Sequence, residues 1–174
     1  MARHEDRREE LLDKIADHLL REGIAGSNLR PLAKAIGLSD RMLLYYFKDK
    51  DDILEAGLGR VADRLTEILN HAASERQLPS EELRAKLAPL LLDDAIWPYM
   101  QLWLEIASLS ARNQPPFSEV GAALGRHFLA WAAAQLDLAE EQARRAEAVR
   151  LFASLEGLVL LKSLGLGEEA KLVY

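Results

Sequence analysis

The chain has 174 residues, 49% of them hydrophobic and 29% charged, which is typical of a folded protein and unlike a disordered one. It contains no cysteine, which excludes disulfides, thiolate catalysis and Cys-ligated zinc. No apolar run reaches the roughly 18 residues that span a bilayer, and the charged start MARHEDRREE is unlike a secretory signal, so we expect no membrane partner and a cytoplasmic location.

The formal net charge of −6 is distributed unevenly along the chain. Residues 1–50 hold ten Lys or Arg against nine Asp or Glu, a net of +1, whereas residues 51–174 hold twelve against nineteen, a net of −7. Contact with phosphates depends on the local charge rather than on the sum over the chain. The acidic total therefore does not exclude a nucleic-acid partner for the first fifty residues.

The first three predicted elements form one unit. Apolar residues at helical spacing over residues 11–20 predict a first helix, which Gly23 ends. Two short helices follow, with Asn28 and Ser39 as N-caps, and they are joined by a turn at Gly37, where glycine can adopt the left-handed conformation. This is the pattern of a helix-turn-helix, a unit that places its second helix in the major groove of DNA.

The last helix of this unit has two faces with different chemistry. The face expected to point into a small three-helix core consists of Leu43, Tyr46 and Phe47. The opposite face carries Arg41, Tyr45 and Lys48. An Arg can donate two hydrogen bonds to guanine O6 and N7, and a Tyr can reach a phosphate or lay its ring against a thymine methyl, while Lys48 and Lys50 suit phosphates. The alternative is that these are simply exposed residues on a solvated helix.

The rest of the chain is also predicted to be helical. A long helix runs from about Lys50 into the low seventies, and at 1.5 Å per residue it would be roughly 35 Å long. Further helices are predicted at about 81–92, 96–112, 117–136 and 140–165. Strand patterns are absent, so the expected fold class is all-α.

Residues 8–58 resemble the tetracycline-repressor (TetR) family of bacterial transcriptional regulators. The matching segments are LLDKIADHLLREG, NLRPLAKAIGLS and LLYYFKDKDDILEA, which agree with the family pattern in spacing and residue type over three helices. The resemblance implies an N-terminal helix-turn-helix DNA-binding domain, here residues 1–50, and a C-terminal helical bundle, here residues 51–174. It implies that the bundle binds a small molecule and forms a homodimer, whose two recognition helices enter successive major grooves of a palindromic operator.

The resemblance also assigns roles to individual residues. By position, Asn28 takes the capping Thr site, Arg30 a position of the second helix that often meets DNA, and Tyr46 a phosphate-contacting site. Lys50 takes the place of the Lys that opens the fourth helix and contacts the DNA backbone. The complete candidate DNA-binding set is Asn28, Arg30, Ser39, Arg41, Tyr45, Tyr46, Lys48 and Lys50.

Three residues depart from the family pattern. Leu44 stands where a Tyr is usual, Met42 where a small Thr is usual, and Arg41 where Gly or Pro is common. Leu44 and Met42 remove two expected phosphate contacts, whereas Arg41 adds a residue that can read a base. The operator sequence of relatives therefore cannot be transferred to this chain.

Large side chains gather between residues 96 and 131, an interval that holds all three tryptophans. As a group they are candidates for an effector cavity, although aromatic and Met side chains at helical spacing are also typical of plain core. Glu105 lies in an apolar stretch, so its carboxylate is expected to be exposed, paired with an Arg, or facing a ligand. The candidate ligand-binding residues are Trp97, Met100, Trp103, Leu104, Glu105, Phe117, Phe128 and Trp131.

The last long helix is apolar on more than one side, which is typical either of a central core helix or of an interface. Small residues on the preceding helix would permit close approach of a second copy, so a four-helix bundle across a two-fold axis is expected. The candidate interface residues are Gly121, Leu124, Leu151, Leu155, Leu158 and Lys162.

Enzymatic signals are weak. The four histidines lack metal-ligand spacing, and no G-x-S-x-G motif, phosphate loop or dinucleotide fingerprint occurs, so we expect no catalysis and no cofactor. Three hypotheses remain open at this point. They are a ligand-responsive repressor, a DNA-binding regulator without a small effector, and an all-helical interaction module or enzyme whose motif is coincidental.

Overall fold

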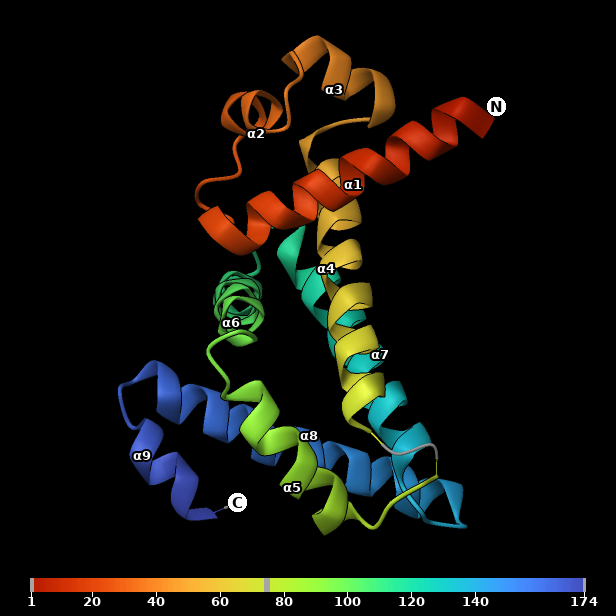
Figure 1. The fold of residues 1–174 in the computed structure, drawn as a ribbon, viewed down its shortest axis with the longest axis vertical. Helices are drawn as coiled ribbons and strands as arrows, with labels where there is room; N and C mark the ends of the chain where they lie inside the picture. Colours follow the sequence, from red (N-terminus) through yellow and green to blue (C-terminus); the bar gives the residue numbers. More distant parts are fainter. Residues whose placement is uncertain (1, 74–75, 174) are drawn as a thin grey trace. The chain divides into compact units, whose positions relative to one another are not determined.

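The computed structural model describes residues 2–73 and 76–173, and over these ranges it contains helices and no strand (Figure 1). In chain order the elements are α1 (Ala2–Glu22), α2 (Leu29–Ala35), α3 (Asp40–Tyr46), α4 (Lys50–Ala72), α5 (Ser80–Leu91), α6 (Trp97–Ala111), α7 (Phe117–Gln135), α8 (Glu141–Ser163), α9 (Gly167–Ala170) and the 3-10 helix η1 (Lys171–Val173). The expected all-α class is confirmed, and α5 to α8 begin and end within two residues of their predicted bounds. The short α9 was not predicted.

The helices group into two compact units, each built from two stretches of chain. Unit 1 comprises Met1–Arg64 and Gln101–Ala122, and unit 2 comprises Leu65–Met100 and Ala123–Tyr174. The divisions fall within α4 and α7 and between Met100 and Gln101 of α6, so all three helices contribute to both units. The expected division into domains at residue 50 stays a prediction.

In unit 1, α1 and α4 cross at a glycine. Ile15 and Leu19 of α1 are fully buried, and a Cβ placed on Gly57 of α4 would lie 2.5 Å from Ile15 Cγ2 and 2.9 Å from Leu19 Cδ1. A side chain at this position would collide with two core residues, so the close crossing depends on glycine. It fixes the beginning of α4 against the helix that precedes the helix-turn-helix.

The loop between α1 and α2 is held by polar contacts inside unit 1. Gly23 ends α1 in the left-handed conformation, with φ of +68°, and its carbonyl accepts a hydrogen bond of 2.6 Å from Ser27 Oγ. The Ser27 side chain is fully buried, and His18 Nε2 lies 3.3 Å from the Gly26 carbonyl oxygen. Because buried polar groups are costly unless they are paired, these contacts stabilise one conformation of the loop.

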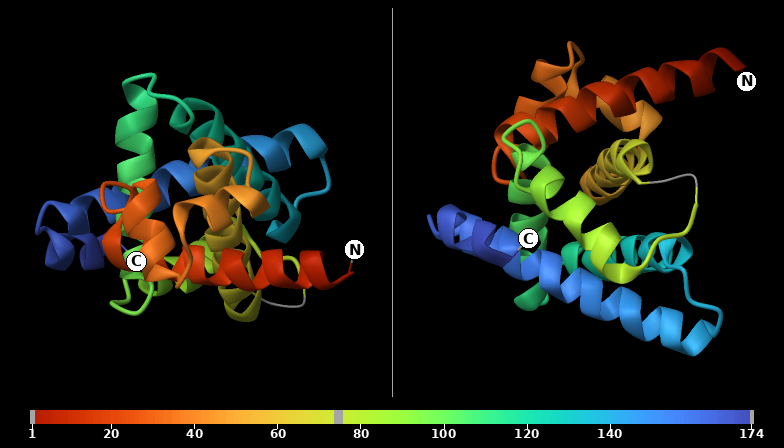
Figure 2. Two further views of the ribbon diagram at one scale, coloured as in Figure 1. Left: turned by 90° about the horizontal axis from the view of Figure 1, so that it is seen from above. Right: turned by 60° about the horizontal axis from the view of Figure 1, so that its bottom comes forward.

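In unit 2, α8 lies alongside α5 (Figures 1 and 2). The facing side chains are mostly leucines, which supply the core of this unit. The buried residues of the two helices include Leu83, Leu87, Leu151, Leu155 and Leu158.

The second half of α4 is joined to α7 by side-chain contacts within unit 2. Thr66 Oγ1 and His127 Nε2 lie 2.9 Å apart, within hydrogen-bond distance. One turn further along each helix, Trp131 Nε1 donates a hydrogen bond of 2.7 Å to Asn70 Oδ1. These two contacts repeat at helical spacing, so this part of α4 lies beside α7 over at least one turn.

Candidate DNA-binding surface

A tight turn joins α2 to α3. Gly37 has φ of +78°, and the N–H of Leu38 donates a hydrogen bond of 2.8 Å to the Ala33 carbonyl, which closes the end of α2. Ser39 then caps α3, because its Oγ accepts a hydrogen bond of 3.2 Å from the Met42 N–H. The predicted turn at Gly37 and the predicted cap at Ser39 are both confirmed.

Asn28 is the N-cap of α2 by position, as predicted, but not by hydrogen bonding. It occupies the N-cap position of α2 in an extended conformation, but its side chain makes no capping hydrogen bond. Asn28 Oδ1 instead accepts a hydrogen bond of 3.0 Å from the ammonium group of Lys50, the first residue of α4. A hydrogen bond from a charged donor is stronger than one from a neutral amide, which explains why the Asn side chain turns toward Lys50. The contact joins the start of α2 to the start of α4.

The two faces of α3 separate as the sequence predicts. Leu43 and Phe47 are 0% and 2% exposed, and Tyr46 is half-buried, with its ring edge-to-face with Tyr45 at 5.2 Å between centroids. The opposite face carries the exposed residues Arg41 and Tyr45, and Lys48 is exposed just after the end of the helix. Arg30 of α2 is exposed as well. The base-reading and phosphate roles of these residues stay predictions, but their side chains are accessible for them.

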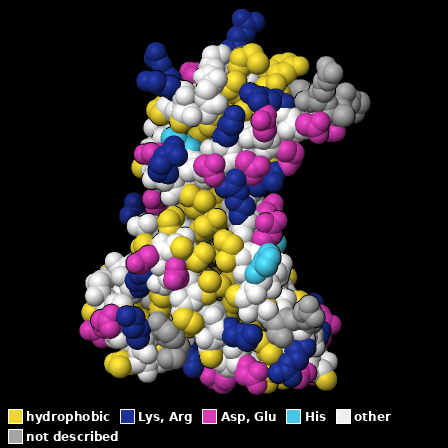
Figure 3. All heavy atoms as spheres, in the orientation of Figure 1, with side chains coloured by type: hydrophobic (Ala, Val, Ile, Leu, Met, Phe, Trp, Pro, Cys, Tyr) yellow, Lys and Arg dark blue, Asp and Glu magenta, His cyan; other side chains and the backbone are white. Residues whose placement is uncertain are grey.

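Two large apolar side chains flank the exposed side of α3. Met42 is 44% and Leu44 is 42% exposed, and together with Arg41 and Tyr45 they line an open depression that we call the recognition face. Hydrophobic and basic side chains lie next to one another over this end of unit 1 (Figure 3). For Met42 and Leu44 the sequence predicts only the loss of two phosphate contacts. Their exposure follows from the helical period of 3.6 residues, because both fall outside the positions of Leu43 and Phe47, which face the core.

The helix-turn-helix itself is more basic than the first fifty residues as a whole. Residues 28–50 contain five Lys or Arg against two Asp, a net of +3. Most of the acidic residues that reduce the charge of the first fifty residues are on α1. Three of these carboxylates point toward α4.

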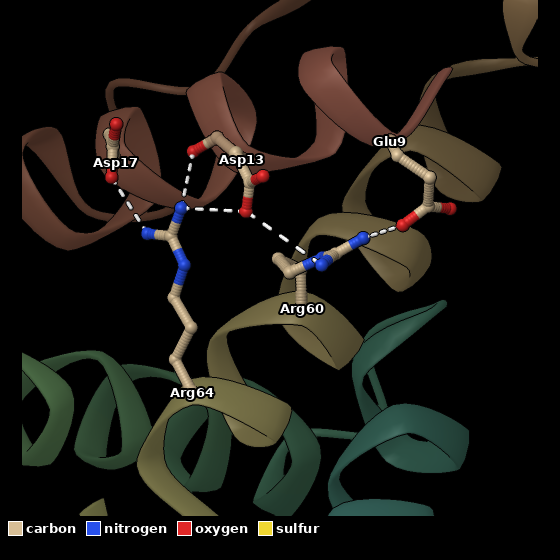
Figure 4. A network of polar contacts seen from close by, with 5 residues as sticks. All are labelled: Glu9, Asp13, Asp17, Arg60 and Arg64. Carbon is tan, nitrogen blue, oxygen red and sulfur yellow. Dashed lines mark hydrogen bonds and ion pairs between the residues drawn. The ribbon is translucent and has the colours of Figure 1, made fainter. Parts of the chain in front are cut away.

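Two arginines of α4 hold those carboxylates in a network (Figure 4). Arg64 bonds Asp13 at 2.8 Å and Asp17 at 2.7 Å, while Arg60 pairs with Glu9 and lies 3.8 Å from Asp13. Burial by itself would lower the pKa of Arg64, but its hydrogen bonds to Asp17 and Asp13 outweigh burial and raise that pKa above its usual value. The two guanidinium groups thereby offset two of the three negative charges at the α1–α4 contact.

The eight residues predicted to bind an effector are divided between the two units. Unit 1 contains Trp103, Leu104, Glu105 and Phe117, and unit 2 contains Trp97, Met100, Phe128 and Trp131. Several of their functional groups already have partners within their own unit. The Glu105 carboxylate bonds the backbone of the α1–α2 loop, the Trp131 N–H bonds Asn70, and the ammonium of Lys162 lies 4.5 Å from the centre of the Trp97 ring. The effector site stays a prediction.

The residues predicted to form a dimer interface are mostly engaged within the single chain. Leu151, Leu155 and Leu158 are only 2%, 7% and 4% exposed. Gly121 does permit a close approach, but to α6 of the same chain, since a Cβ there would lie 3.3 Å from Ser110 Oγ. The face of α8 chosen from the sequence is therefore the face that packs into its own unit, because both faces of this helix are apolar and the pattern alone could not separate them.

Lys162 and Leu124, the other two residues of that set, lie in unit 2. The Lys162 ammonium donates hydrogen bonds to the Leu92 carbonyl at 2.5 Å and to Asp94 Oδ1 at 2.8 Å. It thus satisfies a carbonyl at the end of α5. Leu124 is half-buried.

A different set of residues is exposed on α8. Small and apolar residues recur every three or four positions along five turns of its other side, and we call this set the α8 stripe. It consists of Ala146, Val149, Ala153, Gly157, Leu160 and Leu164. Val149, Leu160 and Leu164 are 53%, 51% and 65% exposed, and nothing lies within 4 Å of a Cβ placed on Gly157. An exposed apolar stripe of this length is typical of a protein–protein contact.

Residues 2–73 and 76–173, the ranges that the structure describes, contain neither a metal-binding cluster nor a membrane-spanning helix. These residues contain no group of three or more His, Asp or Glu that could hold a metal ion. None of the helices over these ranges is both long and apolar enough to cross a membrane.

Comparisons with known proteins agree with the helix-turn-helix geometry. The family described as bacterial regulatory proteins, tetR family, matches residues 11–56. Over 166 residues the chain is 30% identical to the HTH-type transcriptional regulator BetI of Burkholderia thailandensis, a match that covers 94% of this chain and 85% of BetI. The chain belongs to the TetR family of transcriptional regulators.

Two further comparisons extend over most of this TetR-family chain. It is 27% identical over 161 residues to the HTH-type transcriptional regulator PksA of Bacillus subtilis, covering 90% of this chain and 78% of PksA. The crystal structure of a transcriptional regulator from Rhodococcus sp. Rha1 has the same fold, with a TM-score of 0.70 and 24% identity over 94% of this chain and 89% of that one. The likeness therefore extends beyond the helix-turn-helix to the later helices.

Proposed function

We propose that this TetR-family regulator is a ligand-responsive repressor. Two copies bind a palindromic operator as a homodimer, each placing α3 in a major groove, and a small, largely apolar or aromatic effector releases them. In this proposal residues 1–50 read DNA, and residues 51–174 bind the effector and dimerise. The protein acts in the cytoplasm, without a cofactor and without catalysing a reaction.

The observation that carries the proposal is the division of α3 into two faces. Its buried residues fix the helix against the rest of unit 1, while Arg41 and Tyr45 are exposed on a segment with a net charge of +3. The lysines at 48 and 50 and the arginine at 30 supply positive charge on the same segment for phosphates. This is the chemistry that a major groove and its flanking phosphates require.

Support for the homodimer comes from the α8 stripe. A second copy of α8 packed across a two-fold axis would cover the three exposed apolar side chains, and the small residues between them would let the helices approach closely. The two recognition helices must then be about 34–36 Å apart, or a multiple of this distance, to reach both half-sites. The stripe replaces the buried leucines of the earlier expectation as the proposed interface.

Support for an effector comes from the residues between 96 and 131 and from two proteins of the same fold. A regulator from Saccharomonospora viridis was crystallised with choline (TM-score 0.64, 20% identity, 90% of this chain and 85% of that one). FadR from Bacillus subtilis was crystallised with stearoyl-CoA (TM-score 0.60, 17% identity, 90% of this chain and 87% of that one). These ligands differ in charge and size, so the apolar and aromatic class proposed here is drawn from the tryptophans of this chain.

Two measurements on the purified full chain test the proposal. Selection from random duplexes should yield a palindromic sequence whose binding weakens steeply with salt, because Lys and Arg release counterions from the phosphates. A chain that binds no duplex at low salt would refute the DNA-binding function. A panel of aromatic, aliphatic and cationic compounds should contain at least one that raises the melting temperature and lowers operator affinity.

A regulator of the same shape without a small effector is the second candidate. It is favoured by the engagement of Glu105, Trp97 and Trp131 with partners inside their own units. If the selected operator binds tightly and no compound in the panel alters its affinity or the melting temperature, this second function is the correct one.

A further inference from the structure

We propose that the recognition face reads the methyl groups of thymines, so that the operator half-site carries thymines beside the base pair that Arg41 contacts. The proposal rests on the DNA-binding function proposed above and specifies the class of duplex. It concerns Met42 and Leu44, whose side chains have neither a charge nor a hydrogen-bond donor.

The apolar side chains of the recognition face are exposed. Met42, Leu44 and Tyr45 are 44%, 42% and 67% exposed, and all three lie outside the side of this short helix that faces the core. Together with Arg41 they line one depression, so the apolar surface is continuous with a guanidinium. Single exposed apolar residues are common, whereas a cluster on the helix that meets DNA requires an occupant.

Arg41 and Met42 lie at the start of α3. Because Ser39 is the N-cap, Arg41 and Met42 lie in the first turn, and the N-terminal residues of a recognition helix are the ones that reach base edges. At 3.6 residues per turn, Met42 and Leu44 lie about 160° apart around the helix axis, on the two flanks of the exposed side, with Arg41 and Tyr45 between them. Met42 and Leu44 therefore flank Arg41, and in the major groove they would meet base pairs on either side of the one within its reach.

The major groove of DNA presents few apolar groups that a Met or Leu side chain could contact. Phosphate oxygens are charged acceptors, so a Met or Leu placed against them would remove water from an anion without replacing its hydrogen bonds. The edges of guanine, adenine and cytosine present donors and acceptors, whereas thymine presents a C5-methyl group that apolar side chains contact. Thymine methyls are therefore the occupants that match the recognition face.

The experiment begins with a duplex selected by the full-length wild-type protein from a random pool. Each thymine of the half-site is then replaced in turn by uracil, in both half-sites, which removes the methyl group and leaves base pairing intact. Affinities are measured by fluorescence anisotropy for the wild-type protein, for Met42→Ala, for Leu44→Ala and for the double variant. Alanine is the best helix former and both side chains are exposed, so the variants should melt at the wild-type temperature.

At one or two positions, uracil should weaken wild-type binding about fourfold per methyl, the factor that corresponds to burial of one CH₂ group. The same replacement should have a much smaller effect on the double variant, and each single variant should lose most of its sensitivity at one position. Lys48→Ala is the matched control. It should weaken binding to the thymine and uracil duplexes by the same factor, because a phosphate contact does not depend on the base.

Two results would overturn the inference. If the wild-type protein binds every uracil duplex as tightly as the thymine duplex, the recognition face does not read methyl groups although the DNA-binding function stands. If no duplex is selected at all, the proposed function fails together with the inference, and the apolar cluster is then a contact surface for another protein.

Discussion

The carboxylate of Glu105 accepts a hydrogen bond from the backbone N–H of Ile24, with 2.8 Å between Glu105 Oε2 and the Ile24 nitrogen. Glu105 belongs to α6, and Ile24 follows the last turn of α1 by two residues. The neighbouring Gly23 leaves room for this contact, since a Cβ there would lie 2.5 Å from Glu105 Oε1. A carboxylate from residue 105 thus holds the loop that leads into the helix-turn-helix.

Replacing Glu105 by Ala should lower the free energy of unfolding by about 1–3 kcal/mol, because the Ile24 N–H loses its charged acceptor. Urea unfolding and amide hydrogen exchange would measure the effect, and the exchange of the Ile24 amide should accelerate. Glu105→Gln keeps an acceptor oxygen and should lose less stability. Equal loss in both variants would mean that the charge of the carboxylate, rather than the hydrogen bond, stabilises the loop.

Gly57 and Gly59 of α4 provide a matched pair of substitutions. Gly57→Ala should destabilise the protein by about 1–3 kcal/mol, because its Cβ would collide with the buried Ile15 and Leu19. Gly59→Ala meets nothing within 4 Å and should stabilise the helix by up to about 1 kcal/mol, since alanine is the better helix former. Thermal unfolding of both variants checks the prediction, and a stable Gly57→Ala protein would contradict the close crossing of α1 and α4.

The arginine network should make a small, salt-sensitive contribution. Arg64→Met leaves Asp13 and Asp17 without that partner, but both carboxylates are at least half exposed, so the loss should be about 1 kcal/mol or less. The loss should shrink at high salt because the charges are screened. Urea unfolding at two salt concentrations measures it, with Arg145→Met, whose side chain is 74% exposed, as a control expected to change nothing. A loss that is independent of salt would show that packing of the arginine stem dominates.

Two leucines of α8, two positions apart, should respond differently to the same change. Leu160→Glu adds charge to the exposed α8 stripe, so the chain should remain folded but become monomeric and lose operator binding. Leu158→Glu buries a charge at a position that is 4% exposed, and it should reduce stability by several kcal/mol. Sedimentation and circular dichroism separate the two outcomes. A dimeric Leu160→Glu protein would remove the stripe from the interface.

Arg41→Ala should cost about 1–3 kcal/mol of binding to the selected operator and relax the preference at one base pair. Its affinity for random duplexes should change much less, because nonspecific binding depends on phosphate contacts. Anisotropy titrations against the operator and single-position variants of it give both values. Equal loss on operator and random DNA would assign Arg41 to a phosphate instead of a base.

Much of the helix-turn-helix could be predicted because its determinants are local. Gly37 and Ser39 each impose one backbone conformation on their immediate neighbours, and the 3.6-residue period separates Leu43 and Phe47 from the exposed side of α3. Asn28 occupies the predicted N-cap position, but the partner of its side chain could not be predicted because that partner is a distant residue. Lys50 is twenty-two positions further along the chain, and its approach to Asn28 follows from how α4 packs.

The candidate interface could not be chosen from the sequence for a related reason. Two sides of α8 are apolar, and only the packing of α5 decides which of them is buried. Leu151, Leu155 and Leu158 form the stronger hydrophobic pattern, and strong patterns belong to cores at least as often as to surfaces. The exposed side is recognisable afterwards by its small residues, Ala153 and Gly157 among them.

Unit 1 is assembled from two stretches of chain that are thirty-six residues apart, and its second stretch supplies buried residues such as Leu102, Ile106 and Val120. A gene fragment that stops after Arg64 would encode the whole helix-turn-helix and still lack these side chains and the Glu105 carboxylate. Such a fragment would leave its apolar side open to water and should aggregate or remain partly unfolded. Isolating the DNA-reading part of this regulator therefore requires joining the two stretches with a linker, rather than cutting the chain at a single point.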